Sequence, residues 1–146
     1  MSNLTEFLRT KQQQERAEGS SLEKRKEEWL ESLAELFSSI KVWLAEPVSQ
    51  NLIEIAEDDV EIDEYKVGLY KAPSLILRAG HDVVFVEPVG TIIMGANGRV
   101  DVKTGGTSFK IILTDQNEWG ILQPDRTVAT RLDERTFTKA LQDLLS

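Results

Sequence analysis

Residues 29–44 read WLESLAELFSSIKVWL, and their spacing predicts an α-helix with one apolar face. At about 100° per residue, the apolar side chains fall within an arc of roughly 140°. Residues 20–23 (SSLE) form a capping-box pattern, and Pro47 pushes the residue before it out of the α region, so we expect a long amphipathic helix over 20–45. Its apolar face consists of Leu22, Trp29, Leu30, Leu33, Leu36, Phe37, Ile40, Trp43 and Leu44.

The stretch upstream of this helix predicts a polar helical arm over 1–19. Leu4, Phe7 and Leu8 give the arm a short apolar edge, but residues 11–18 are almost wholly polar. A helix that is polar all round frays or stands in solvent. We therefore expect a frayed arm, interrupted by the glycine and two serines at 19–21 before the long helix begins.

Downstream of the long helix the hydrophobic period falls to two, which predicts β-strands over 51–131. The links between strands are short and have turn residues. Asn97-Gly98 matches a two-residue type I′ hairpin, and Gly105-Gly106 predicts a second tight turn. Short links require antiparallel neighbours, because a parallel pair needs a crossover of a dozen or more residues. The sequence therefore predicts an antiparallel β-meander, either an open or a partly closed sheet.

A short C-terminal helix is predicted over 133–145, with Asp133 as its N-cap. Its apolar side chains share one face, as those of the long N-terminal helix do. Helix, meander and helix make an α+β fold in which the two helices pack against the apolar face of the sheet. The length of 146 residues fits a single domain over 1–146.

The charge of the chain is concentrated in one short segment. The formal net charge is -8, and residues 46–64 contain eight acidic and no basic side chains, whereas the flanking blocks are nearly neutral. Alternating apolar and acidic residues at 52–55 and 60–63 predict two strands joined by a turn at 57–59. Such acids protect a sheet edge from unwanted pairing, bind a hard cation, or meet a basic partner. The partner-binding candidates are Glu57, Asp58, Asp59, Glu61 and Glu64.

The composition argues against several classes of protein. Four glutamates closely follow the basic cluster at 24–26, so we expect no nucleic-acid binding. The apolar runs are strand-sized, which argues against membrane insertion. The chain has no cysteine and no secretory signal at its start, and these features favour a cytoplasmic location.

Residues suited to catalysis are sparse. The single histidine, His81, lies in Gly80-His81-Asp82, a sequence typical of a turn. Zinc needs three or four Cys, His or acid ligands, and here only carboxylates are plentiful. The acids at 57–64 lack the spacing and the glycine of a calcium loop. We therefore expect no catalytic residue, no metal and no cofactor.

Three hypotheses remain open from these patterns. The favoured one is a non-enzymatic interaction or regulatory module, of the adaptor, inhibitor or immunity type, that presents an acidic surface to a basic protein partner. The alternative is a small-ligand or divalent-metal-dependent enzyme with a carboxylate site in a curled sheet. The third is a homodimer through the near-heptad seam from Trp29 to Trp43, although covering the sheet is the simpler role for that seam.

Overall fold

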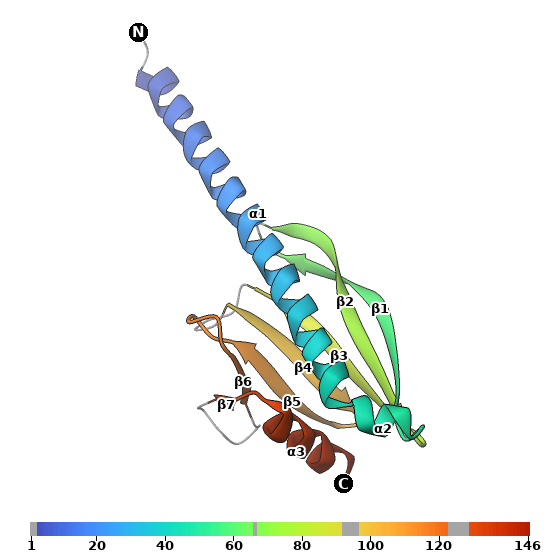
Figure 1. The fold of residues 1–146 in the computed structure, drawn as a ribbon. Coiled ribbons are helices and arrows are strands. Elements are labelled where there is room, and N and C mark those ends of the chain that lie inside the picture. The colour runs from blue at the N-terminus through green and yellow to red at the C-terminus, as the bar shows by residue number, and fades with distance from the viewer. Residues whose placement is uncertain (1–2, 66, 92–96, 123–128) are drawn as a thin grey trace.

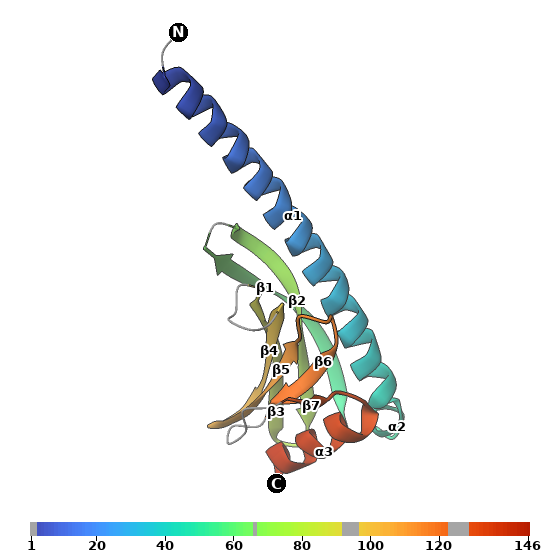
Figure 2. The same cartoon turned by 90° about the vertical axis from the view of Figure 1, so that its left-hand side faces the viewer.

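A computed structural model shows a seven-stranded antiparallel sheet with helices packed on one face (Figure 1). The long helix α1 (Asn3–Trp43) crosses that face diagonally and is followed by the short helix α2 (Ala45–Ser49). The C-terminal helix α3 (Glu134–Leu145) covers the other end of the same face (Figure 2). The α+β class and the packing by a long and a short helix are confirmed. The structure describes residues 3–65, 67–91, 97–122 and 129–146.

The strands follow one another across the sheet in chain order, each antiparallel to the next, which confirms the meander. Within the described residues β1 and β7 stand at the two ends of this order and do not pair with each other, so the sheet is open. The strands are β1 (Glu54–Glu64), β2 (Gly68–Ala79), β3 (Asp82–Gly90), β4 (Gly98–Thr104), β5 (Thr107–Leu113), β6 (Trp119–Leu122) and β7 (Thr130–Arg131).

The core lies between the sheet and the helices. In register across the sheet, buried residues face one another, as Leu77 faces Val84 and Val102 faces Phe109. The expected apolar face of α1 covers this layer. Burial of each large apolar side chain contributes about 1.5–3 kcal/mol, so this layer holds the domain together. The buried side chains of α1 are those of Trp29, Leu33, Leu36, Phe37 and Ile40.

The expected break between an arm over 1–19 and a helix starting at residue 20 is absent, because residues 19–21 are all helical and α1 is continuous. A glycine in a helix costs only about 1 kcal/mol, which leaves the hydrogen-bond ladder intact. The other end is set by Pro47. Proline lacks an N–H, and its ring would clash with the carbonyl of Trp43 four residues earlier. α1 ends at Trp43, two residues before the expected end at 45. The expectation that Pro47 keeps the preceding residue out of the α region is wrong, because Glu46 is helical in α2 (Ala45–Ser49).

The expected turn at 57–59 is wrong, because β1 runs through it as one strand. The apolar residues of β1 change faces there: Ile55 is odd-numbered, whereas Val60 and the buried residues after it are even-numbered. The partner strand changes in step, from buried Ala72 to buried Leu75, and the pairing register stays unbroken. When the alternation of buried residues changes from odd to even in one segment, the sequence suggests two strands. Here the change occurs in both paired strands at the same place, so they form one bent two-stranded ribbon.

The expected type I′ turn at Asn97-Gly98 is also wrong. Gly98 is the first residue of β4, pairs with Leu113, is buried, and has a φ outside the left-handed region. The ring of Trp29 packs directly on its backbone, so this glycine permits a close approach between helix and sheet. Most of the strand expected before that turn lies at 92–96, outside the described residues. A tight turn at Gly105-Gly106 is confirmed, but Gly105 has a φ of 54° while Gly106 lacks the positive φ of a type I′ turn.

The N-cap of α3 is Asp133, as expected. Its carboxylate accepts a hydrogen bond of 2.9 Å from the Thr136 N–H, and the Thr136 hydroxyl accepts one of 2.9 Å from the Asp133 N–H. The bond from the Thr136 N–H holds the pKa of Asp133 below its ordinary value. This reciprocal pair fixes where α3 begins and points Phe137 into the core.

We expect Gly98→Ala to lower the free energy of unfolding by about 1–3 kcal/mol, because overpacking a filled core forces its neighbours to move. A methyl group there would lie 2.1 Å from Cζ3 of Trp29, whose side chain is 2% exposed. Urea unfolding followed by tryptophan fluorescence measures the loss. Gly106→Ala is the matched control, because a methyl group at Gly106 meets nothing within 4 Å. Equal stability of the two variants would contradict this role of Gly98.

Candidate functional site

No cluster of three or more His, Cys, Asp or Glu side chains that could bind a metal ion occurs among the described residues. His81 is exposed in the turn between β2 and β3, as its sequence context predicted. A cleft of about 380 Å³ lies between α1 and the β5–β6 connection, lined among others by Arg25, Glu28 and Asn117. The predicted partner-binding residues are acids of β1, within residues 57–64.

Three of the predicted partner-binding residues, Asp58, Asp59 and Glu61, are exposed side by side on β1. Because β1 is the last strand of the sheet, one side of its backbone faces away from β2. Asp63 is also exposed on this strand. We call Asp58, Asp59, Glu61 and Asp63 the acidic edge.

Glu57 points to the helical side of the sheet. Its carboxylate forms an ion pair with the ammonium group of Lys41 on α1. The two side chains are 57% and 45% exposed, so the pair contributes at most about 1 kcal/mol to stability. The ion pair matters more for partner binding, because Lys41 already neutralises the charge of Glu57. Glu57 is therefore a poorer candidate for partner binding than the acidic edge.

Glu64 does not belong to any exposed surface, which corrects its assignment as a partner-binding residue. It is 9% exposed, and its carboxylate accepts hydrogen bonds from the Tyr70 hydroxyl and the Thr91 N–H. The Thr91 hydroxyl donates a third bond, of 3.1 Å, to the same carboxylate. After the face change at 57–59, even-numbered residues of β1 point inward, and this places Glu64 on the same side as buried Ile62.

We call Glu64, Tyr70 and Thr91 the hairpin anchor. It links the end of β1 to the start of β2 and to the residue after β3, and α1 joins it through two cations. Arg25 donates a hydrogen bond to the Thr91 carbonyl, and the Lys26 ammonium lies 5.8 Å from the centre of the Tyr70 ring. The anchor therefore fixes the β1–β2 hairpin against the helix.

The chemistry of the hairpin anchor is that of a structural contact. Burial raises the pKa of Tyr70, as do its hydrogen bond to Glu64 and the negative charge of that carboxylate, while the Trp29 indole opposes the rise. At neutral pH this phenol keeps its proton, so it is not available as a general base, and its raised pKa makes it a weak general acid. The residues lining the cleft beside α1 include neither Tyr70 nor Glu64, so no substrate path to the pair is evident in the described part of the chain.

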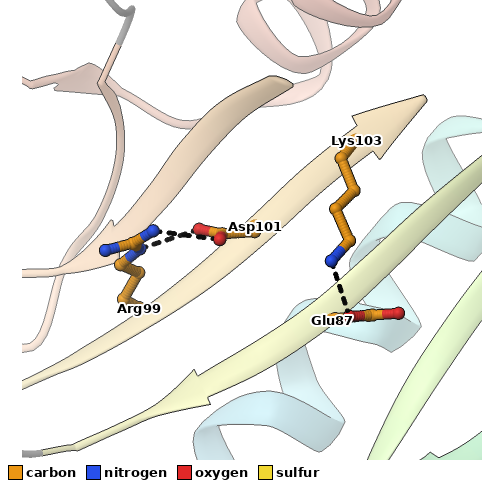
Figure 3. A network of polar contacts seen from close by, with 4 residues as sticks. All are labelled: Glu87, Arg99, Asp101 and Lys103. Carbon is orange, nitrogen blue, oxygen red and sulfur yellow. Dashed lines mark hydrogen bonds and ion pairs between the residues drawn. The ribbon is translucent and has the colours of Figure 1, made fainter. Parts of the chain in front are cut away.

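Two ion pairs lie on the sheet face opposite the helices (Figure 3). The guanidinium of Arg99 makes two bonds to the Asp101 carboxylate, of 2.7 and 3.0 Å. Lys103 of β4 pairs with Glu87 of β3 at 3.1 Å. Asp101 also raises the pKa of Arg99 through its hydrogen bonds. The four charges of these two pairs balance one another, whereas the acidic edge forms no ion pair within the described residues.

Sequence reasoning assigned no role to Tyr70 and placed Glu64 on the surface. A usable signal existed in the alternation of Val60 and Ile62, because continuing that period by one step puts Glu64 on the apolar side. The partner Thr91 is 27 residues away, and no pattern in the sequence connects the two. Among the described residues Glu64 is the acid that the fold buries.

Comparison with known proteins gives no match to a protein-family model, to a curated protein or to a solved structure. Within the described residues, no helix combines the length and the apolar character that crossing a membrane would need. What the chain does is therefore inferred from its own residues.

We expect Tyr70→Phe to lower the free energy of unfolding by about 1.5–3 kcal/mol near neutral pH, because buried Glu64 loses a donor. The loss shrinks as the pH rises above the ordinary tyrosine pKa of 10.0, since the folded protein keeps the proton that the unfolded chain releases. Stability from Tyr70 is thus complete below that pH and declines above it. Urea unfolding of both proteins across the alkaline range measures the difference.

Tyr65→Phe is the control for this experiment, because the Tyr65 side chain is 80% exposed. Its neutral-pH stability should stay within about 0.5 kcal/mol of the parent value. If Tyr70→Phe and the parent protein decline in parallel at high pH, the hairpin anchor does not hold a protonated phenol.

Proposed function

We propose that this protein is a non-enzymatic interaction module that binds a basic segment of another protein along the acidic edge of β1. The observation that carries the proposal is the coincidence of charge and position. The acidic edge lies on the outermost strand of the sheet, where one side of the backbone faces away from β2. An extended basic segment could satisfy both features, by adding a strand and by neutralising the carboxylates.

The local charge balance supports this proposal. In the β1–β2 register, Asp58, Asp59 and Asp63 stand opposite Ser74, Pro73 and Leu69, none of which carries a charge. Glu61 stands opposite Lys71, so the surroundings of Glu61 are less negative than those of the other three acids. Among the described residues none of these four acids takes part in an ion pair, whereas Glu57, Glu87 and Asp101 each do.

Protection of the sheet edge explains the same acids without a partner. A strand of 11 residues with an open edge would pair with strands of other molecules, and acidic side chains oppose such pairing between copies. The two roles are compatible, because repulsion excludes another acidic or neutral strand and favours a basic one. The negative charge of this edge therefore favours partner strands that carry positive charge.

The alternative of an enzyme with a carboxylate site in a curled sheet has less support. It requires at least two buried carboxylates around a pocket, and among the described residues Glu64 is the acid that is buried. Three donors already occupy that carboxylate. No specific observation favours this second function.

We expect Asp58→Asn/Asp59→Asn/Asp63→Asn to weaken binding of a basic probe about tenfold at low salt, which is the effect of three exposed charges worth about 0.5 kcal/mol each. The probe is a fluorescent peptide of alternating lysine and valine, and anisotropy gives its dissociation constant. Asparagine keeps the size of the side chains, so circular dichroism should show an unchanged fold.

The control variant is Glu27→Gln/Glu31→Gln/Glu35→Gln, which removes three exposed acids from α1 and reaches the same net charge. Its affinity for the probe should stay close to that of the parent protein. Amide exchange should also slow in β1 on binding, because an added strand protects its open backbone groups. Equal weakening by the two triple variants, or no protection of β1, would rule out the acidic edge as the binding site.

A further inference from the structure

The first half of α1 extends beyond the sheet in both views (Figures 1 and 2). Every described residue from 3 to 21 is exposed, and the first side chain of α1 to be buried is that of Trp29. We call residues 3–22 the projecting segment. The contacts of Arg25 and Lys26 with the hairpin anchor mark where the body of the domain begins.

The projecting segment is a poor helix on its own. Helices in water gain most of their stability from packing of an apolar face, and this one contains a glycine and two serines at 19–21, which disfavour helix. It nevertheless exposes large apolar side chains near its start, with Leu4 62%, Phe7 63% and Leu8 51% exposed. A second helix packed along the segment would account for both features.

One stripe of the projecting segment has the spacing of a helix-packing surface. Its members recur every three or four residues, at an average of about 3.6, so they follow a straight line along the helix. The stripe is apolar at both ends and charged in the middle. From start to end it contains Leu4, Leu8, Lys11, Glu15, Glu18 and Leu22.

We propose that the projecting segment pairs antiparallel with the same segment of a second copy of this chain. An antiparallel pair centred on residue 13 sets Leu4 against Leu22 of the second copy, and Lys11 against Glu15 of the second copy. By symmetry each of these contacts occurs twice. Leu8 meets Glu18 of the second copy, whose aliphatic carbons cover it while the carboxylate reaches solvent.

Charge selects this orientation over the parallel one. In a parallel pair the stripe would set Lys11 against Lys11, Glu15 against Glu15 and Glu18 against Glu18 of the other copy. Like charges at such positions oppose pairing, whereas opposite charges set partner and direction. The antiparallel pair replaces two of these three repulsive layers with ion pairs.

This dimer differs from the one considered for the seam from Trp29 to Trp43. Trp29, Leu33, Leu36 and Ile40 of that seam are buried against the sheet of the same molecule, so the seam cannot serve a second copy. The projecting segment lies upstream of that seam, and its residues 3–21 are exposed while Leu22 is half-buried. With half of its stripe polar, it gives a weak, concentration-dependent dimer in which the two sheets lie at opposite ends of the helix pair.

Sedimentation velocity of the full chain over a concentration series tests the proposal. We expect a monomer–dimer equilibrium whose dissociation constant rises about tenfold in Lys11→Glu and in Glu15→Lys, since each change turns two attractive contacts into repulsive ones. Mixing these two variants should restore dimers, because the heterodimer again opposes unlike charges. A local effect on one helix would not be rescued by mixing.

The matched controls are Arg9→Glu and Glu6→Lys, which reverse exposed charges on the face of the same helix away from the stripe. They should change the dissociation constant by no more than about twofold, the range expected for a surface charge. A chain that stays monomeric throughout the concentration series overturns the proposal. The projecting segment would then bind a different protein. Equal weakening by the control variants overturns it as well.

Orientation can be tested by cross-linking, because the parent chain contains no cysteine. A mixture of Leu4→Cys and Leu22→Cys should form a covalent dimer on mild oxidation, since the antiparallel pair brings these positions together. Leu4→Cys alone should not cross-link, because its two copies would lie about 27 Å apart along the helices. A covalent dimer of Leu4→Cys alone would overturn the antiparallel arrangement.

Discussion

The packing of the second half of α1 on the sheet is the contact on which the rest of the structure depends. At the upper end of this contact the ring of Trp29 packs on the backbone of Gly98. The centroids of the Trp29 and Trp119 rings are 6.0 Å apart. At the lower end Trp43 packs against Phe137, 5.6 Å away, and so brings α3 into the same layer. Within the described residues α1 and α3 supply the apolar cover of this one-layer sheet, so the helices and the sheet are stable only together.

This contact also divides α1 into two halves with different roles. Downstream of Trp29 the helix is part of the core, whereas upstream it stands clear of the sheet and keeps its polar surface. The hairpin anchor lies at the boundary, where Arg25 and Lys26 reach Thr91 and Tyr70. The domain thus offers two separate surfaces, a helix and a strand edge. If both bind, a dimer through the helix would carry two acidic edges and gain avidity for a partner with repeated basic segments.

The acidic segment shows how one stretch of like charge is sorted by the fold. Of its eight acids, one is buried and hydrogen-bonded, one is paired with α1, and four form the acidic edge. The other two, Glu46 on α2 and Glu54 at the start of β1, are exposed. The bend of the β1–β2 ribbon decides this sorting, because it changes which alternate residues face the helix. A net charge counted along the sequence therefore overstates the charge available to a partner, and the position of each carboxylate matters more than the total.

The sequence alone determined the helix face from Trp29 to Leu44, the antiparallel meander and the cap at Asp133, because local periodicity, short links and capping chemistry act between near neighbours. Tertiary structure decided where Glu64 points and why Gly98 is a glycine. Both depend on residues that are far apart along the chain. The Thr91 N–H donates a hydrogen bond to Glu64, and the ring of Trp29 packs where Gly98 has no side chain. Such contacts leave no period in the sequence, since they arise only when helix and sheet pack.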